Sequence, residues 1–379
     1  NMMGGLHQLL DNGTEEQKKK FLPRIVNGEI GAIVITEPVA GTDASAIAVE
    51  ARREGDVYVL NGKKRYIVSA GVATRYMVYA RTSNDAADIR KHRHLTAFIV
   101  ESGAKGFTVE KVNELIGFSN IQNGVLDFDD VEVPVANRLG EEGDGWNVMT
   151  GGLNFERTLI SAQATGWIGE LLQNVVPFTQ RRVQFGRPTI DIPENQFKIA
   201  DLVLKRRASR LLTYHTAYMW DLGRDITMDS NVAKLFNVES ALEASIDAIQ
   251  VMGGDATTLF YPVEEIMKVA KVESIAGGTI EALRMILFRT AMRQLGAQIA
   301  WRRRVPHAEL GVPVPVYGEL PKDRAITKEK LLAFLAEDYR VNPGLHMTRQ
   351  DIKDGFDADD GTLELPDADL PQDVALVSG

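Results

Sequence analysis

The chain has 379 residues, which is long for a single hydrophobic core and suits two or three domains. Its net charge of −9 argues against a nucleic-acid-binding surface, and the absence of cysteine excludes disulfides, thiolate catalysis and cysteine-ligated metals. No apolar run approaches the roughly 20 residues that a membrane span needs, and no secretory signal opens the sequence. We therefore expect an ordinary globular protein.

Residues 1–29 are predicted to be helical. In "NGTEEQKKKFLPRIVNGE", Thr14 is a candidate N-cap, acidic residues follow it in the first turn, and lysines come later, as the helix dipole favours. The sequence begins within a helical pattern. We therefore expect these residues to be the remnant of a larger N-terminal helical domain, whose rest is missing or lies on another chain.

Residues 30–135 have the texture of β-structure. "DVYVLNGKKRYIV" is interpreted as two extended runs joined by Asn61-Gly62, the strongest short signal for a hairpin. Further extended runs are "RYMVYART", "HLTAFIV", "GFTVEKV" and "VLDFDDVEV". Short strands at regular spacing predict a small β-barrel or sandwich.

Residues 136–300 are predicted to form four long amphipathic helices joined by short links, which is typical of an antiparallel bundle. We expect the first helix to be interrupted near Gly151-Gly152 and the fourth to break at Gly277-Gly278. The predicted fold class is therefore α+β. Residues 301–379 are interpreted as a proline-punctuated linker, a short helix and an acidic, solvated tail.

This order of elements resembles the acyl-CoA dehydrogenases over about residues 1–296. Five stretches carry the resemblance: "ITEPVAGTDASA", "VLNGKKRYIVSAG", "LDFDDVEVPVANRLGEEGDGW", "RRVQFGRP" and "QVMGGD…YPVEEIMKVAKVESIAGGTIEALR". The family joins a helical N-terminal domain, a middle β-domain and a C-terminal four-helix bundle around FAD. The resemblance implies that this chain lacks most of the first domain.

The resemblance also implies the FAD contacts. The turn after "ITEP" would lie against the flavin, with Thr42 also near the CoA pyrophosphate, and a second stretch would lie beside the isoalloxazine. These positions are Ile35, Thr36, Gly41 and Thr42, then Tyr66 and Val68. Family members commonly have Trp and Thr where this chain has Tyr66 and Val68. Val68 has no hydroxyl for flavin N5, although its backbone N–H could serve.

Other residues would reach the FAD of a neighbouring subunit, so the resemblance implies a homo-oligomer, most simply a homotetramer. They are Arg182, Gln184, Phe185, Gln250 and Gly254, while Thr279 and Glu281 complete the predicted cofactor set. An arginine at a helix end suits a pyrophosphate. Gly254 and the glycine before it could instead cap the end of a helix. The family's Gln after "FG" and its Tyr-Gly-Tyr after the double Gly are both replaced here.

Glu156 is the predicted catalytic base. Many members carry the base in Tyr-Glu-Gly-Thr, but here that stretch is Ala276-Gly277-Gly278-Thr279. In the isovaleryl-CoA and long-chain members the base lies on the neighbouring long helix, directly before an arginine, which is Glu156-Arg157 here. Helical spacing aligns Glu156 with Leu153, Leu159 and Ile160 on a core-facing stripe, where an unpaired carboxylate is costly. The alternative is a structural ion pair.

The reaction that the resemblance implies is α,β-dehydrogenation of an acyl-CoA thioester. Glu156 would take the α proton while hydride leaves the β carbon for flavin N5. The Gly277 N–H, together with a ribityl hydroxyl, would stabilise the enolate oxygen. Asn154 and Arg157 are the predicted substrate contacts. Because Ala276 and Gly277 are small, we expect room for a branched, cyclic or long acyl group.

Several alternatives remain open at the level of sequence. Electrons would pass to an electron-transfer flavoprotein, or to oxygen if the protein is an oxidase. The chain could also be a subunit of a heteromer, with reduced or no activity alone, or a relative that performs elimination without net oxidation. The histidines show no metal-ligand spacing. The expected location is the cytoplasm, or the mitochondrial matrix in a eukaryote.

Overall fold

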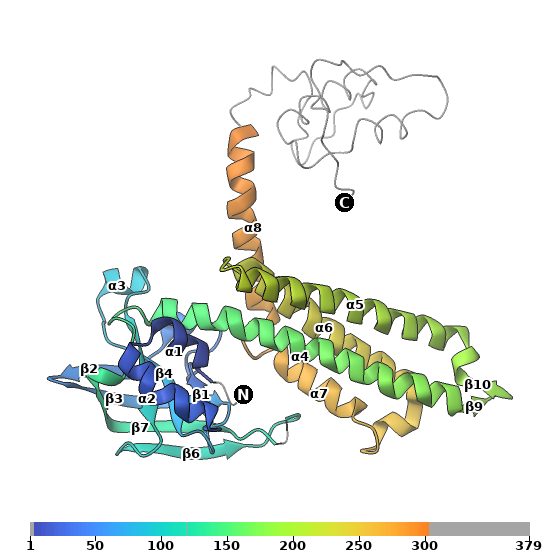
Figure 1. Ribbon diagram of the computed structural model, residues 1–379, viewed down its shortest axis with the longest axis horizontal. Coiled ribbons are helices and arrows are strands. Elements are labelled where there is room, and N and C mark those ends of the chain that lie inside the picture. Colours follow the sequence, from blue (N-terminus) through green and yellow to red (C-terminus); the bar gives the residue numbers. More distant parts are fainter. Residues whose placement is uncertain (1–3, 119, 303–379) are drawn as a thin grey trace. The chain divides into compact units, whose positions relative to one another are not determined.

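The computed structural model describes residues 4–118 and 120–302 (Figure 1). The chain divides into two compact units, Asn1–Phe288 and Arg289–Gly379, and everything below concerns the first. Of the predicted linker, short helix and acidic tail, residues 303–379 lie outside the described residues. Among the helices described here, none combines the length and apolar character that crossing a bilayer requires.

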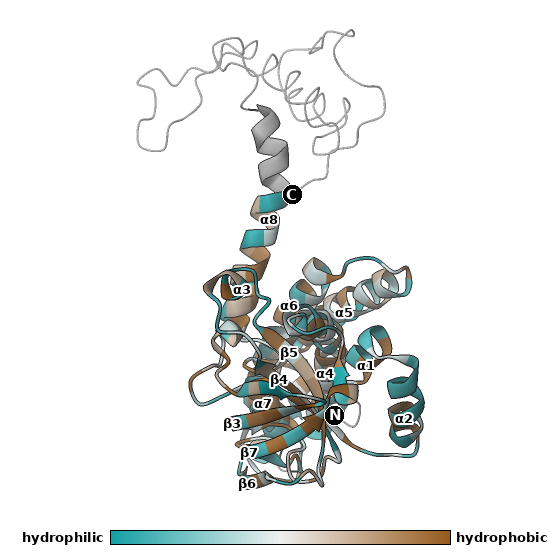
Figure 2. Cartoon of the chain, turned by 90° about the vertical axis from the view of Figure 1, so that its left-hand side faces the viewer, coloured by the Kyte–Doolittle hydropathy of each residue, from teal (hydrophilic) through white to brown (hydrophobic). Residues whose placement is uncertain are grey.

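The N-terminal segment forms two helices, α1 (Leu6–Asn12) and α2 (Glu15–Val26). The predicted N-cap is confirmed: the Thr14 hydroxyl accepts a hydrogen bond from the Gln17 N–H at 3.2 Å. The Gln17 side chain in turn accepts from the Thr14 N–H at 3.0 Å, which completes a capping box. Polar residues colour much of α2 teal in Figure 2, so this helix shows mostly its hydrophilic face there.

The next segment forms one mixed eight-stranded sheet in the order β6-β7-β3-β2-β4-β5-β8, with β1 parallel to β4. The strands are β1 (Gly31–Val34), β2 (Glu50–Glu54), β3 (Val57–Ile67), β4 (Arg75–Arg81), β5 (Leu95–Glu101), β6 (Phe107–Asn113), β7 (Asn123–Pro134) and β8 (Arg138–Leu139). Short helices lie between them: η1 (Ala44–Ala46), α3 (Ala86–Arg90) and η2 (Val135–Asn137). The predicted β-domain is therefore confirmed as an open sheet, and its strands do not close into a barrel.

One core serves both halves of this sheet. The halves pair through a single residue pair, Glu50 with Arg81. Tyr58 of β3 nevertheless packs on Phe98 of β5, with ring centroids 4.8 Å apart, and both side chains are fully buried. The two halves of the sheet thus pack their apolar side chains against each other, as the predicted sandwich requires.

The predicted hairpin at Asn61-Gly62 is wrong. β3 runs straight through this dipeptide, and its register against β7 shifts there, which marks a bulge. Gly62 has a φ of 128°, and a Cβ at Gly62 would lie 3.0 Å from the Val49 side chain. Asn61 is held instead by Asp130, to whose carboxylate it donates at 2.9 Å and from whose N–H it accepts at 3.0 Å. The turn between β2 and β3 is at Gly55, where φ is 61°.

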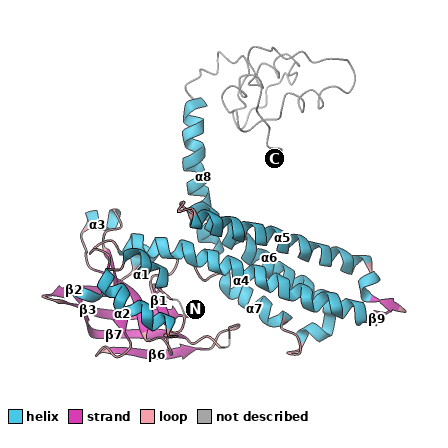
Figure 3. Cartoon of the chain, in the orientation of Figure 1, coloured by secondary structure: helices cyan, strands magenta, loops and turns pink. Residues whose placement is uncertain are grey.

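The predicted four-helix bundle is confirmed by helices α4 to α7, which lie together in Figure 3. The helices are α4 (Gly145–Arg181), α5 (Pro193–Asp221), α6 (Thr227–Met252) and α7 (Val263–Glu273), followed by α8 (Ile280–Arg302). Short elements connect them: β9 (Val183–Gln184), β10 (Arg187–Pro188), η3 (Thr189–Asp191) and η4 (Gly253–Thr257). Buried side chains such as Ile168, Leu202 and Val238 form the bundle core.

The two helix interruptions predicted at glycine pairs have different outcomes. α4 is continuous through Gly151-Gly152, so the predicted interruption is wrong. A Cβ at Gly152 would collide with the Gln8 side chain, so this glycine lets α1 approach α4 closely. The predicted break at Gly277-Gly278 is confirmed, because α7 ends at Glu273 and α8 begins at Ile280. Both glycines there have positive φ, 65° and 95°, which side chains rarely adopt.

Candidate active site

Glu156 lies in the first third of α4, on the side of the helix that faces the protein interior. The predicted stripe is only partly correct. Leu153 packs against the core between α4, α2 and the sheet, and Ile160 packs against the bundle core, but Leu159 is 50% exposed. Glu156 therefore occupies the boundary between the two cores. The Glu156 residue as a whole is half-buried, while its carboxyl group is surrounded by protein atoms.

The environment of Glu156 suits a base rather than a structural ion. Burial, and next the negative charge of Glu273, raise the pKa of the Glu156 carboxyl to about 7, and the neighbouring Arg157 offsets this only in part. Within residues 4–118 and 120–302, Glu156 forms no salt bridge. A general base works best when its pKa lies near the operating pH. The geometry thus favours the predicted base over the structural ion pair.

Residues 274–279, hereafter the 274–279 turn, pack directly against α4. Arg157 donates from Nε to the Gly277 carbonyl at 3.0 Å, and Lys234 of α6 donates to the Gly278 carbonyl at 2.9 Å. A Cβ at Gly277 would lie 2.8 Å from the Ile160 side chain. Two buried cations and a tight contact with Ile160 therefore fix this turn, and in the described chain the Gly277 N–H has no hydrogen-bond acceptor.

Asn154 and Arg157, the predicted substrate contacts, lie together and bind each other. The Asn154 side-chain oxygen accepts from Arg157 Nη1 at 3.1 Å, and its amide donates to the Thr227 hydroxyl at 3.0 Å. Arg157 is 7% exposed, and burial lowers its pKa to about 10. Arg157 also bonds the 274–279 turn, and a direct contact of either residue with substrate stays a prediction.

Residues 35–42, hereafter the 35–42 turn, are anchored by a buried ion pair. Lys64 Nζ lies 2.8 Å from a Glu37 carboxylate oxygen and also donates to the Ile35 carbonyl at 2.8 Å. The Glu37 carboxylate further accepts the N–H groups of Ala48 and Val49 at 2.6 and 3.0 Å. Burial lowers the pKa of Lys64 to about 8. β3 is thereby tied to the turn that carries the predicted flavin contacts.

The other predicted flavin contacts lie along this junction. Thr36 accepts the Arg65 N–H at 2.9 Å, which brings the 35–42 turn beside Tyr66. Tyr66 has a φ of 59° and is 53% exposed, with the Arg65 guanidinium over its ring. Gly41 and Thr42 are exposed, and Val68 is half-buried. The structure therefore brings the predicted 35–42 and 66–68 stretches together on one accessible edge.

A second group of predicted residues lies at the far end of α4. Arg182, Gln184 and Gly254 line one cavity of about 500 Å³. Phe185 follows in the β9–β10 turn and is 94% exposed, while Gln250 is exposed on α6. Since Glu156 and Arg182 are 26 residues apart along one helix, they are separated by roughly 40 Å. The predicted cofactor residues therefore form two separate groups (Figure 1).

Thr279 has a structural role at the start of α8, and Glu281 lies in the first turn of that helix. The Thr279 hydroxyl accepts the Ala282 N–H at 3.2 Å, which caps the start of α8. Hydrogen bonds from the Glu281 backbone and from Thr279 lower the pKa of the Glu281 carboxyl. Their predicted cofactor contacts remain predictions.

Sequence reasoning missed three buried polar residues at this site: Tyr79, Lys234 and Glu273. Lys234 is fully buried on α6, within the apolar pattern "NVAKLFNV", which is a signal that could have found it. Tyr79 is fully buried on β4, and burial, followed by the charge of Glu156, raises its pKa. Glu273 sits at the end of α7, where no local pattern distinguishes it from a surface residue.

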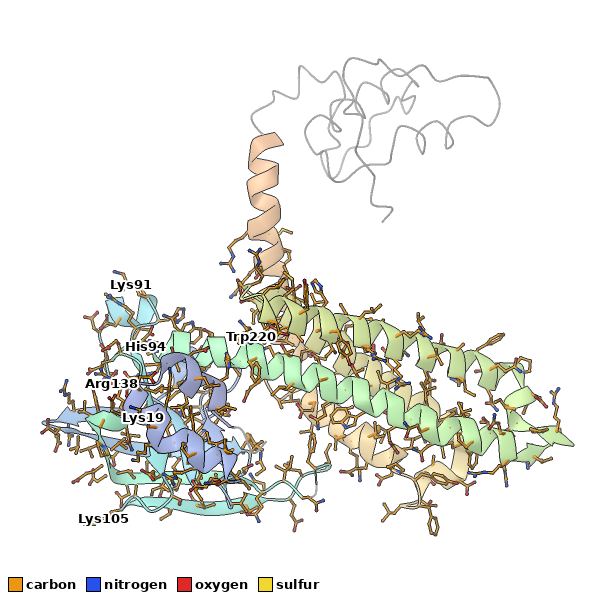
Figure 4. The ribbon with its side chains drawn as sticks, viewed as in Figure 1. Lys19, Lys91, His94, Lys105, Arg138 and Trp220 are labelled. Carbon is orange, nitrogen blue, oxygen red and sulfur yellow. The ribbon has the colours of Figure 1, made fainter. Side chains whose placement is uncertain are left out.

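The histidines serve local packing. His94 (labelled in Figure 4) contacts the Ser45 carbonyl through Nε2 at 2.9 Å. His7 stacks on Phe155 with centroids 4.5 Å apart, and both rings contact Trp220, which Figure 4 places where α5 ends. In the portion of the chain that is described, no three potential metal ligands gather.

Comparison with known proteins supports the same interpretation along most of the chain. Residues 32–131 match the acyl-CoA dehydrogenase middle domain, and residues 143–292 match the acyl-CoA dehydrogenase C-terminal domain. The acyl-CoA dehydrogenase of Bacillus subtilis (strain 168) is 38% identical over 285 residues, which cover 75% of this chain and 74% of that enzyme. The mitochondrial isovaleryl-CoA dehydrogenase of Pongo abelii is 34% identical, covering 75% of this chain and 67% of that protein.

A solved structure agrees with these matches. The butyryl-CoA dehydrogenase of Megasphaera elsdenii superimposes with a TM-score of 0.73 at 36% identity, and the match covers 76% of this chain and 74% of that one. Both domain matches and the placement of Glu156 between the sheet and the bundle lead to one conclusion. The chain belongs to the acyl-CoA dehydrogenase family of oxidoreductases.

Proposed function

We propose that this protein is an FAD-dependent acyl-CoA dehydrogenase in which Glu156 removes the α proton of the thioester. The observation that carries the proposal is the state of Glu156. Its carboxyl group lies deep in the protein, forms no salt bridge with the described residues, and has a pKa raised to about 7. Native proteins rarely retain such a group unless it has a chemical role.

The residues present fit FAD as the cofactor. Arg182, Gln184 and the exposed backbone at Gly254 offer a charged and polar cavity, which suits a pyrophosphate. The 35–42 turn and Tyr66 offer backbone groups and an exposed aromatic face for the flavin ring. When bound, FAD supplies the acceptor for the hydride that leaves the β carbon.

The chain's own groups would act on the other hydrogen. Glu156, in its carboxylate form, accepts the proton from the α carbon and holds it, which a pKa of about 7 allows at neutral pH. The Gly277 N–H donates to the thioester carbonyl oxygen as negative charge develops there. Arg157 and Lys234 hold the carbonyls of Gly277 and Gly278, so this donor is fixed before the substrate arrives.

We further propose that the active enzyme is an oligomer, a homotetramer or a heteromer that supplies the N-terminal domain. The two cofactor groups at the ends of α4 are too far apart for one FAD molecule, so they would serve two cofactors in neighbouring subunits. α5 also exposes an apolar stripe, and every residue in it is more than half exposed. The stripe consists of Phe197, Leu204, Leu211 and Tyr218. A stripe with a seven-residue repeat suits packing against another helix.

The acyl group and the electron acceptor are proposed on separate grounds. The isovaleryl-CoA and butyryl-CoA dehydrogenases are about equally similar to this chain, so similarity does not discriminate between branched and straight acyl groups. The small residues Ala276 and Gly277 favour a branched, cyclic or long group. We propose an electron-transfer flavoprotein as the acceptor, with an oxidase as the alternative.

The test is an anaerobic titration of the purified flavoprotein with a panel of acyl-CoA thioesters, following loss of the flavin absorbance. We expect bleaching by at least one thioester, and its loss in Glu156→Gln. Glu243→Gln is the matched control, because Glu243 is an exposed carboxylate on α6. Bleaching by Glu156→Gln at the wild-type rate would refute the role of this residue. Oxygen uptake with the same thioester would identify an oxidase.

A further inference from the structure

A second carboxylate lies beside Glu156. Glu273 is the last residue of α7 and leads into the 274–279 turn. Helical hydrogen bonding continues past it, because the Ser274 N–H donates to Ala270 at 3.0 Å and the Ala276 N–H to Val272 at 3.1 Å. Glu273 therefore lies where α7 passes into the turn, four residues before Gly277.

The 274–279 turn packs against the surface of α4 that carries the base. Gly277 touches Ile160, and Arg157 bonds its carbonyl. Ile160 and Glu156 are four residues apart and share one face of α4. Glu273 therefore leads directly into the segment that contacts the face of α4 carrying Glu156. Consistent with this, the charge of Glu273 raises the pKa of Glu156.

Glu273 is poorly compensated where it lies. Its Oε2 is buried and finds no hydrogen-bond partner among the described residues. The C-terminal end of a helix also disfavours negative charge. Of the described residues, Lys234 is the cation that acts on Glu273, but the Lys234 ammonium is already bonded to the Gly278 carbonyl. Burial raises the pKa of Glu273 to about 7.

Among residues 4–118 and 120–302, the charged and titratable groups that act on Glu156, or on which it acts, come from three elements. α4 contributes Arg157, α7 contributes Glu273, and β4 contributes Tyr79. Lys234 of α6 acts on Glu273. Arg157 and Tyr79 keep one protonation state near neutrality, since the pKa of Arg157 is about 10 and burial raises that of Tyr79. Glu273 alone among them titrates in the same range as Glu156.

We propose that Glu273 is a positioning residue for the reaction. Its carboxyl group is enclosed with that of Glu156 at the 274–279 turn, so that the pair carries one negative charge near neutrality. Glu273 thereby determines the pH above which Glu156 is an active base. This inference rests on the proposed function of Glu156. Two carboxyl groups that interact in this way release their protons in two coupled steps.

The experiment compares wild type with Glu273→Gln, each as the full chain with bound FAD. The rate of anaerobic flavin bleaching is measured against pH with the most reactive thioester. We expect the acidic limb of the Glu273→Gln profile to move down by about one pH unit, with rates below the limb rising by up to about tenfold. Glu273→Asp, which retains the charge, and Glu243→Gln, a surface control, should leave the limb near its wild-type position. A rate that falls equally at all pH values, with an unmoved limb, would show a merely structural role and overturn the proposal.

A second readout does not depend on turnover. Infrared spectra report protonated carboxyl groups, and the band that disappears in Glu156→Gln belongs to Glu156. We expect the midpoint of this band to move to lower pH in Glu273→Gln, and an unchanged midpoint contradicts the coupling. If no thioester bleaches the wild-type flavin, the proposed function fails, while the band midpoint still determines whether the two carboxyl groups are coupled.

Discussion

The 35–42 turn and helix α4 each place a glutamate inside the protein, Glu37 and Glu156, and the surroundings of the two glutamates are opposite. Glu37 is met by Lys64 at 2.8 Å and by two backbone N–H groups. Glu156 has no salt bridge among the described residues, and the cation beside it, Arg157, is bonded to the 274–279 turn instead. A fully partnered buried carboxylate stabilises a structure, whereas an unpartnered one keeps the capacity to take a proton.

The sharpest test of this contrast is the activity of Glu156→Gln. Because the amide cannot accept the α proton, we expect the rate of flavin bleaching to fall by about 10²–10⁴-fold. Stopped-flow absorbance under anaerobic conditions measures this rate. The FAD content should stay at the wild-type level. Retention of more than a tenth of the rate would place the base elsewhere.

The second test concerns the partnered glutamate, Glu37, and measures the stability of the variant Lys64→Met. This change leaves Glu37 buried without its cation, and breaking a buried pair in this way costs about 3–5 kcal/mol of the free energy of unfolding. Urea denaturation measures it. Lys63→Met is the matched control on the same strand, because Lys63 pairs with Glu110 on the surface, and we expect a loss of less than about 1 kcal/mol. Equal losses in the two variants would contradict the structural role of the buried pair.

A smaller effect is expected from Gly277→Ala. A side chain at a φ of 65° costs about 1–2 kcal/mol, and the new methyl group would press on Ile160. Bleaching should also slow, because the turn that holds the Gly277 N–H must shift. Gly151→Ala is the control, since nothing lies within 4 Å of a Cβ at this helical position. There we expect unchanged bleaching and a gain of up to about 1 kcal/mol.

The last expected effect is on the pH dependence of stability. The pKa of Glu156 in the folded protein, about 7, is above its ordinary value of 4.5. Between these values the folded protein binds a proton that the unfolded chain has released, so this group makes the free energy of unfolding fall as pH rises. Glu156→Gln should remove that fall. Thermal unfolding across this window should show the variant gaining on wild type, and a constant difference would count against the raised pKa.

Some features of the molecule could be predicted because neighbouring residues determine them. The Thr14 cap depends on Gln17 three positions away, and the break at Gly277-Gly278 depends on two glycines in sequence. The position of the Glu-Arg pair on a long helix was equally visible. The raised pKa of Glu156 was not visible, because it arises first from burial and then from the charge of Glu273, which is more than 100 residues away in the chain.

By itself, the sequence determined the α+β fold class with a β-sheet region followed by a helical bundle, the family, and Glu156 as the candidate base. Only the tertiary structure decided that Asn61-Gly62 forms a bulge held by Asp130, that Gly152 makes room for Gln8, and that Leu159 faces outward. The tertiary structure also brought Lys234 to the 274–279 turn and the charge of Glu273 within reach of Glu156. The physical reason is that local patterns encode backbone preference. Burial and charge depend on which groups other elements bring to a residue.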